Sequence, residues 1–242
     1  KLKKLKLSKL CEFVHFCCTS EDINNLSYSL MLQRFLDIEF LPEVNFLQKN
    51  LNSLARKYSK LSILAFTHGQ PASPTTLGKE FSNYSYRIKF HSDLIKSIKQ
   101  KGKFNGASGN YNAHVVADKK VNWETLSKKF VNSLGLDFSS HSTQIELKDA
   151  MAFQLANTHN LNNVLIDFAQ DIWLLISKNY LKQNMNAGEV GSSTMPHKVN
   201  PIDFENAEGN LSIANGLIIA LKNKIQISRL QRDLSDSTVL RN

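Results

Sequence analysis

The chain has 242 residues, and its 30 lysines and arginines against 21 aspartates and glutamates give a formal net charge of +9. Apolar residues make up 42% of the chain and charged residues 21%, which excludes an intrinsically disordered protein and predicts a substantial buried core. No run of about 18 uncharged apolar residues occurs, so we expect no membrane span. The cysteines Cys11, Cys17 and Cys18 form no C-x-x-C pair. We therefore expect reduced thiols in a cytoplasmic protein, and no metal site.

The excess positive charge is spread along the chain, apart from a lysine-rich start within residues 1–9. No zinc finger, arginine-rich stripe or aromatic RNA-binding motif accompanies it, so we expect no nucleic-acid partner. A solvated lysine-rich surface, or a few cations that attract a small anion, explains the charge instead. A basic module that binds polyanions remains an alternative.

Long stretches with helical periodicity and few glycines or prolines predict an all-α fold. The first stretch covers residues 20–58 and is interrupted only by Pro42, which predicts a kink or a break. A second helical stretch covers residues 75–101, and a shorter helix is expected near residues 119–134, after a glycine-rich turn at 102–114. No pattern of alternating apolar residues and turns predicts a β-sheet.

Residues 143–185 contain no glycine or proline, which predicts one long helix. Its second half is apolar nearly all round, so we expect it to be buried on several sides. One chain of this length does not cover such a helix easily. We therefore predict a long-helix bundle that assembles as an oligomer.

The segment at residues 188–201 reads GEVGSSTMPHKVNP and combines a polar loop with a predicted helix start. Asn200 is the expected N-cap, with Pro201 at the first helical position. A flexible loop beside a helix N-terminus suits carboxylate binding and proton transfer, although spacing alone equally fits an ordinary connector. The residues that would do this chemistry are Ser192, Ser193 and Lys198.

The motif GSSTMPHKVNP resembles GSSxMPxKxNP, the signature of the fumarase/aspartase superfamily, at every fixed position. With His197, the MPHK part of this motif resembles the adenylosuccinate lyase branch of the superfamily. Further segments resemble the same branch: TSEDINN at 19–25, THGQPASPTTLGKE at 67–80, GNYNAH at 109–114, TQIE at 143–146 and QRDLSDSTVLRN at 231–242. The resemblance implies that residues 1–242 form the central helical domain of this family, with the family's flanking parts absent.

For catalysis, the resemblance implies a β-elimination that releases fumarate from adenylosuccinate and leaves AMP. The same family also acts on succinyl-aminoimidazole carboxamide ribotide in purine biosynthesis, and it needs neither metal nor organic cofactor. By resemblance Ser192 is the base and His68 the general acid, while Glu205 orients and charges His68. A histidine suits the acid role because its pKa lies near neutrality. We expect His68 in a turn between helical segments.

For substrate binding, the resemblance implies contacts at Thr19, Ser20, Gln144, Ser193, Lys198, Val199, Asn200, Asn206, Arg232, Ser237 and Arg241. Thr19 and Asp22 have capping-box spacing, so we expect a helix N-terminus there as well. Gln144 is expected at the start of the long helix. Ser237 and Arg241 are four residues apart, hence on one helical face, where a hydroxyl and a guanidinium suit a phosphate.

The resemblance also implies a homotetramer whose active sites are shared between subunits. Two alternatives remain open. One is a catalytically silent structural protein with the lyase fold, and the other is a superfamily lyase for another succinyl-type substrate.

Overall fold

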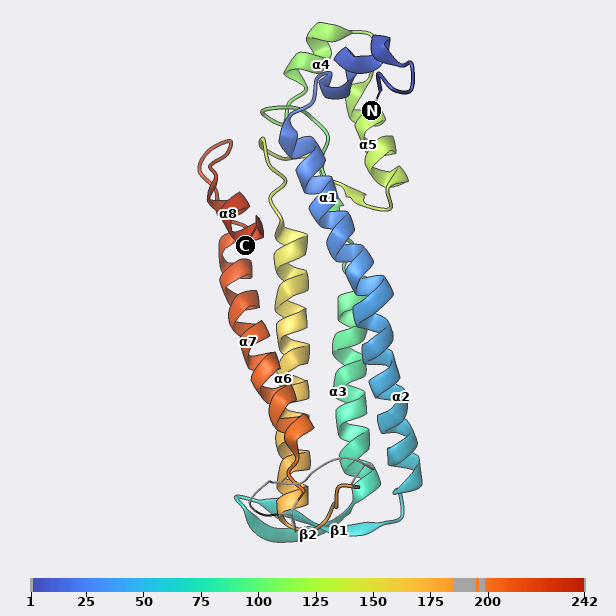
Figure 1. Ribbon diagram of the computed structural model, residues 1–242, viewed down its shortest axis with the longest axis vertical. Coiled ribbons are helices and arrows are strands. Elements are labelled where there is room, and N and C mark those ends of the chain that lie inside the picture. Colours follow the sequence, from blue (N-terminus) through green and yellow to red (C-terminus); the bar gives the residue numbers. More distant parts are fainter. Residues whose placement is uncertain (1, 185–194, 196–198, 242) are drawn as a thin grey trace. The chain divides into compact units, whose positions relative to one another are not determined.

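The computed structural model describes residues 2–184, residue 195 and residues 199–241 (Figure 1). Its elements in chain order are η1 (Ser8–His15), α1 (Ser20–Phe35), η2 (Leu36–Phe40), α2 (Leu41–Lys57), β1 (Ser62–Thr67), β2 (Gln70–Thr76), α3 (Leu77–Ser97), β3 (Lys101–Gly102), α4 (Asn112–Ala117), α5 (Trp123–Ser133), β4 (Asp137–Phe138), α6 (Asp149–Ser177), α7 (Ile202–Lys224) and α8 (Ser235–Arg241). Long helices dominate, which confirms the predicted helical-bundle class. No helix in the described ranges is long and apolar enough to cross a membrane.

The chain divides into two compact units that each combine distant parts of the sequence. The first unit comprises residues 1–40, 97–154 and 221–242, and the second comprises residues 41–96 and 155–220.

The predicted irregularity near Pro42 is present, but it lies just before the proline. Residues Leu36–Phe40 form one π-helical turn, and α2 then begins at Leu41. Pro42 follows this helical turn after Leu41, and since proline has no N–H to donate to the preceding turn, the irregular hydrogen bonding lies where the proline requires it.

The core of the first unit lies between α1, α5 and β4. Leu26, Val131 and Leu136 are at most 4% exposed and form one apolar cluster. A Cβ on Gly102 would lie 2.4 Å from Leu26 Cδ2, so only glycine lets β3 pass this close to α1. Helix α5 begins at Trp123, within the expected range of residues 119–134, and the Asn122 side chain caps it by accepting a hydrogen bond from the Thr125 N–H (2.9 Å).

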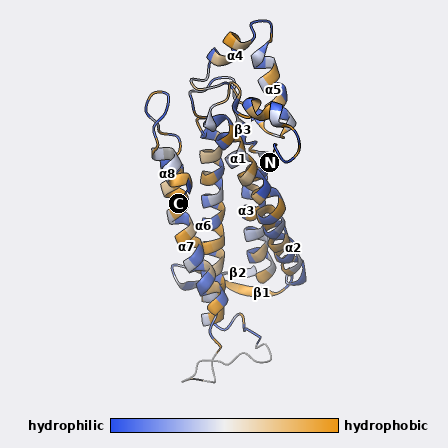
Figure 2. Cartoon of the chain, turned by 45° about the horizontal axis from the view of Figure 1, so that its top comes forward, coloured by the Kyte–Doolittle hydropathy of each residue, from blue (hydrophilic) through white to orange (hydrophobic). Residues whose placement is uncertain are grey.

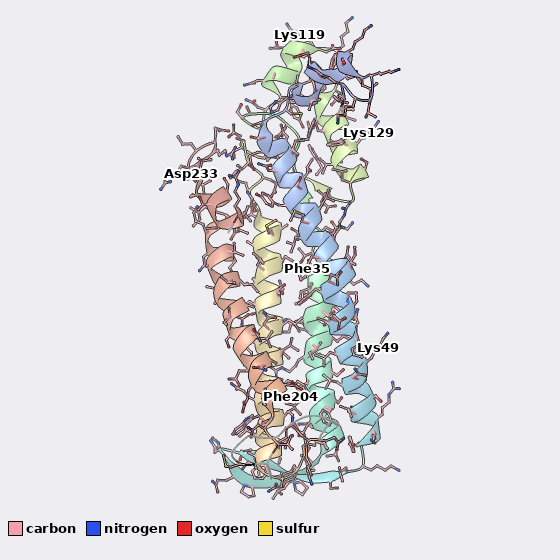
Figure 3. All side chains as sticks on the ribbon, in the orientation of Figure 1. Phe35, Lys49, Lys119, Lys129, Phe204 and Asp233 are labelled. Atoms are coloured by element: carbon pink, nitrogen blue, oxygen red, sulfur yellow. The ribbon has the colours of Figure 1, made fainter. Side chains whose placement is uncertain are left out.

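The second unit contains α2, α3, α6 from residue 155 onward and α7 up to residue 220 (Figure 1). A Cβ on Gly78 would lie 2.3 Å from the Ala55 carbonyl oxygen, which explains how α3 starts directly against the end of α2. Between α6 and α7, the Asn162 side chain donates to the Asn215 side chain at 3.0 Å. Phe204 of α7, labelled in Figure 3, packs with its ring centroid 6.5 Å from that of Phe168 on α6.

An antiparallel hairpin of β1 and β2 precedes α3, which corrects the expectation of no sheet. Strand β1 (SILAFT) is largely hydrophobic in Figure 2, yet it has only six residues, too few for a clear alternating pattern. Strand β2 contains Pro71 and Pro74, which argue against a strand in sequence reasoning. A second small sheet pairs β3 with β4 in parallel.

The long helix is shorter than predicted, because α6 begins at Asp149 rather than at residue 143 and ends at Ser177. Its 29 residues span about 43 Å at 1.5 Å per residue. Lys148 has a positive φ of 57°, so the backbone changes direction immediately before the helix.

Candidate active site

Two of the predicted substrate-binding residues, Thr19 and Ser20, lie at the N-terminus of α1. The Thr19 N–H donates to Asp22 Oδ2 (2.9 Å), and the Asp22 N–H donates to the Thr19 carbonyl oxygen (3.0 Å). This confirms the predicted cap, in which the Asp22 side chain closes the first turn. Ser20 is the first helical residue and is exposed. Its hydroxyl and the first amides of α1 can therefore meet a ligand.

A buried ion pair anchors the next loop to this helix end. Lys103 Nζ lies 2.8 Å from Asp22 Oδ1, and both side chains are fully buried. Lys103 also donates to the Gly106 carbonyl oxygen (3.0 Å), while the N–H groups of Asn105 and Gly106 donate to Asp22. Burial lowers the pKa of Lys103, and Asp22 opposes that shift by favouring the charged ammonium. No sequence signal marks Lys103 apart from its place in the glycine-rich turn.

The C-terminal segment brings Arg232 to the same helix end. Arg232 Nη2 lies 3.2 Å from Glu21 Oε1, with the arginine side chain 17% exposed and the glutamate 3% exposed. Arg232 Nε and Ser237 Oγ are both buried and have no hydrogen-bond partner in the described part of the chain. Two buried donors without acceptors are costly, so an anionic ligand that accepts from both would be stabilised here.

Ser237 and Arg241 both lie in α8, as predicted, but their environments differ. Ser237 is 5% exposed, whereas Arg241 is exposed at the last position of the helix. The preceding loop carries Asp233, labelled in Figure 3, whose carboxylate accepts hydrogen bonds from the Ser235 N–H (2.7 Å) and hydroxyl. These hydrogen bonds lower the pKa of Asp233, so this cap keeps its charge at the start of α8.

Gln144 does not begin the long helix, which corrects the prediction from the sequence. It lies in an irregular segment between β4 and α6 and is half-buried. The glycine-rich turn packs against this segment, because a Cβ on Gly109 would lie 2.3 Å from the Ser142 carbonyl oxygen. Gly109 also has a φ of +72°, which favours glycine. The Asn105 side chain donates to Ser142 Oγ (2.8 Å) and strengthens this contact.

In the second unit, His68 occupies the tip of the β1–β2 hairpin. Thr67 pairs with Gln70, which leaves a two-residue turn of His68 and Gly69. Both have positive φ angles, 54° and 72°, as a type I′ turn requires. A histidine with positive φ is uncommon, and its imidazole is exposed here. His68 therefore lies in a turn, as predicted, but between strands rather than helices.

A cavity of about 550 Å³ lies beside this hairpin, between β1, β2, α3 and α6. Thr67 and Gly69 line it next to the His68 tip, and Tyr84 lines it from α3. The Tyr84 hydroxyl donates to the Asp171 carboxylate (2.5 Å). Burial raises the pKa of Tyr84 strongly, and the hydrogen bond to Asp171 raises it further, so the phenol stays protonated.

Glu205 lies on α7 and has a partner that the sequence did not predict. Its Oε1 accepts a hydrogen bond from the Trp173 indole N–H of α6 (3.0 Å). One turn along both helices, Gln170 donates in the same way to Glu208 (2.8 Å). Among the described residues Glu205 makes no ion pair with His68, so that pairing stays a prediction.

The remaining predicted residues lie at the start of α7 or before it. Val199 and Asn200 are half-buried, and the Asn200 carbonyl oxygen accepts from the Ile202 N–H (2.9 Å). Helix α7 begins at Ile202, one residue later than predicted. Asn206 is exposed on α7, where its carbonyl oxygen accepts from the Asn210 side chain. Ser192, Ser193 and Lys198 lie outside the described residues.

The described site residues thus fall into two groups, one in each unit. The first contains Thr19, Ser20, Gln144, Arg232, Ser237 and Arg241, and the second contains His68, Val199, Asn200, Glu205 and Asn206. Within the described ranges no group of three or more histidines, cysteines or acidic residues could hold a metal ion.

Comparisons with known proteins give a consistent result. The chain is 52% identical over 237 residues to an adenylosuccinate lyase of Buchnera aphidicola, covering 98% of this chain and 52% of the relative. It is 49% identical over 237 residues to that of Escherichia coli, with the same coverage. The chain therefore spans about half the length of these curated relatives.

A solved structure of similar fold is the 3-carboxy-cis,cis-muconate lactonizing enzyme from Pseudomonas putida. Its TM-score is 0.76 at 22% identity, and the match covers 95% of this chain and 50% of that one. The similarity supports the helical fold alone. A family model described as a lyase matches residues 2–216. The resemblance to adenylosuccinate lyases is thereby confirmed, and the chain belongs to this lyase family.

Proposed function

We propose that the chain forms the central helical part of an adenylosuccinate lyase, a cytoplasmic enzyme that splits adenylosuccinate into AMP and fumarate. The same enzyme would act on succinyl-aminoimidazole carboxamide ribotide. The observation that carries the proposal is about 50% identity to adenylosuccinate lyases over 98% of the chain. Membership in the lyase family supports the reaction type.

The phosphate of such a substrate needs cations and donors that replace its water. Arg232 Nε and Ser237 Oγ, both buried and without a hydrogen-bond partner among the described residues, supply two such donors. Arg241 lies in the same C-terminal segment and adds a third, exposed donor group. The chemistry of these groups suits a phosphate monoester, as a nucleotide substrate requires.

In the proposed reaction, Ser192 removes the proton from the carbon beside a carboxylate, and His68 protonates the departing nitrogen. The C–N bond then breaks, and fumarate leaves. Lys198 and Asn200 would stabilise the charge that develops on the carboxylate. Glu205 would orient the His68 imidazole, as the family resemblance implies. No metal or organic cofactor has a role in this scheme.

We further propose a homotetramer in which several subunits contribute to each active site. Helix α7 carries Ile213 and Leu217, which are 68% and 64% exposed. Neither Gly209 nor Gly216 has a described atom within 4 Å of an added Cβ, so another helix could approach this side closely. Apolar surface of this kind favours contact with further subunits.

The direct test is fumarate release from adenylosuccinate by the intact protein, followed by absorbance. We expect turnover without added metal. Turnover of another succinyl compound but not of adenylosuccinate would identify a different lyase. The absence of turnover with every such compound would identify a structural protein with the lyase fold.

A further inference from the structure

We propose that Glu21 is a positioning residue whose buried carboxylate holds the Arg232 guanidinium in the orientation that binds the substrate's phosphate. The inference rests on the proposed function and adds a residue that the family resemblance does not assign. Glu21 itself would not touch the substrate.

The contact between Glu21 and Arg232 joins distant parts of the chain. Arg232 Nη2 lies 3.2 Å from Glu21 Oε1, and the same oxygen accepts a hydrogen bond from the Asn24 side chain (3.0 Å). Glu21 is 3% exposed and lies in the first turn of α1, so its carboxylate is shielded from solvent. The carboxylate is therefore a fixed acceptor for an otherwise flexible side chain.

The neighbouring acid is not available for this purpose. Asp22 is committed to Lys103 at 2.8 Å and to the Thr19 N–H at 2.9 Å. Each of the two adjacent acids thus holds one cation. Glu21 is the acid that holds Arg232.

The contact leaves part of the guanidinium free for a ligand. A guanidinium has five N–H donors in a rigid plane, and an acceptor on one nitrogen fixes the direction of the others. Arg232 Nε is buried without a partner in the described ranges, and so is Ser237 Oγ in the same segment. An arginine held in advance loses less rotamer freedom when a phosphate binds.

A carboxylate near a phosphate site could also act only through its charge, by repelling the ligand. The two roles predict opposite results, because removal of a repelling charge strengthens phosphate binding, whereas removal of a positioning contact weakens it. Glu21→Gln separates them further, since glutamine keeps an oxygen acceptor at the same chain length but carries no charge.

The experiment measures the binding of AMP and of adenosine to the intact protein by isothermal titration calorimetry. We expect Glu21→Ala to raise the Kd for AMP at least tenfold and Glu21→Gln to stay within threefold of the wild type. The Kd for adenosine should change less than twofold in both. Asn24→Ala is the matched control, because it removes the other hydrogen bond to the same oxygen and should leave AMP binding within twofold.

Circular dichroism would establish that each variant is folded. If Glu21→Ala does not fold, Glu21→Asp replaces it, because the aspartate side chain keeps the charge but is too short to reach Arg232. The Kd for AMP should then rise several-fold.

Unchanged or tighter AMP binding in the variant used would overturn the positioning role. Equal weakening of AMP and adenosine would show a structural role instead. A wild-type protein that binds AMP no better than adenosine would refute the proposed phosphate site itself, which is a distinct outcome.

Discussion

Arg241 ends α8 with an exposed guanidinium, while Ser237 one turn earlier is buried, and its hydroxyl has no partner in the part of the chain that the structure describes. A charge-assisted contact to phosphate contributes roughly 1.5–3 kcal/mol. We therefore expect Arg241→Ala to raise the KM for adenylosuccinate by about tenfold to a hundredfold. Arg241→Lys should not restore it fully, because lysine lacks the planar fork. Steady-state kinetics provides the measurement.

A substrate without its phosphate is the control for Arg241. It should bind poorly to the wild type and should be almost indifferent to the substitution. Equal weakening of both substrates would make Arg241 structural and would place the phosphate elsewhere.

His114 is 2% exposed, and neither ring nitrogen has a partner in the described part of the chain. Burial lowers its pKa below the ordinary 6.5; the nearby Asp22 opposes this shift, while Lys103 adds to it. Because the folded pKa is the lower one, the unfolded chain binds more protons between the two values. His114 therefore stabilises the fold above about pH 6.5, and this contribution is lost as the pH falls through the lowered pKa.

When the pH is lowered from 7.5 to 5.5, the free energy of unfolding should fall less in His114→Phe than in the wild type. Urea denaturation at both pH values measures this difference. Phenylalanine fits the surrounding rings of Phe104 and Trp123 and carries no proton. His141→Phe is the control, because His141 is exposed in the same unit and its replacement should leave the pH dependence unchanged. An identical pH dependence for His114→Phe and the wild type would contradict this account.

Among the described residues, two neighbouring hydrogen bonds run from α6 to glutamates of α7, and one of them reaches a predicted catalytic residue. Trp173 donates to Glu205, whereas Gln170 donates to Glu208. Trp173→Phe removes the indole donor that fixes the Glu205 carboxylate, so Glu205 should orient His68 less well. We expect kcat to fall several-fold with KM nearly unchanged.

Gln170→Leu is the matched control for Trp173→Phe, since it removes the neighbouring hydrogen bond without touching Glu205. It should leave kcat nearly unchanged. Equal losses of kcat in both variants would show that packing between the two helices, rather than the indole donor, matters.

The sequence predicted most of the helices because apolar periodicity and caps are local signals. The Thr19–Asp22 cap, for example, follows directly from residue type and spacing. The β1–β2 hairpin was missed because its strands are short and β2 contains two prolines. Its tip at His68 depends on positive φ angles, which only Gly69 signals.

The candidate site was predicted through motifs, whereas its supporting contacts were not. The partners Glu21–Arg232 and Asp22–Lys103 are far apart in sequence, so no local pattern reveals either pair. The Trp173–Glu205 hydrogen bond depends on the register between two helices, which periodicity does not fix. Gln144 was placed on a helix because residues 143–148 contain no helix breaker, although the backbone there is irregular.

At the scale of the whole molecule, the proposed assembly makes a prediction about mixed subunits. If each active site takes residues from several chains, inactive Ser192→Ala and His68→Ala proteins should regain part of the activity when their subunits exchange. The mixture should be compared with each variant alone after the same treatment. A monomer at micromolar concentration in light scattering would contradict the proposed tetramer.

Ser192 is the proposed base of the reaction that releases fumarate from adenylosuccinate. The most direct measurement compares turnover and adenylosuccinate binding in the wild type and in Ser192→Ala. We expect turnover to fall by orders of magnitude while the Kd stays within about threefold, because binding uses other contacts. Turnover near that of the wild type in Ser192→Ala would contradict the assignment and would move the base to another residue, with Ser193 as the next candidate.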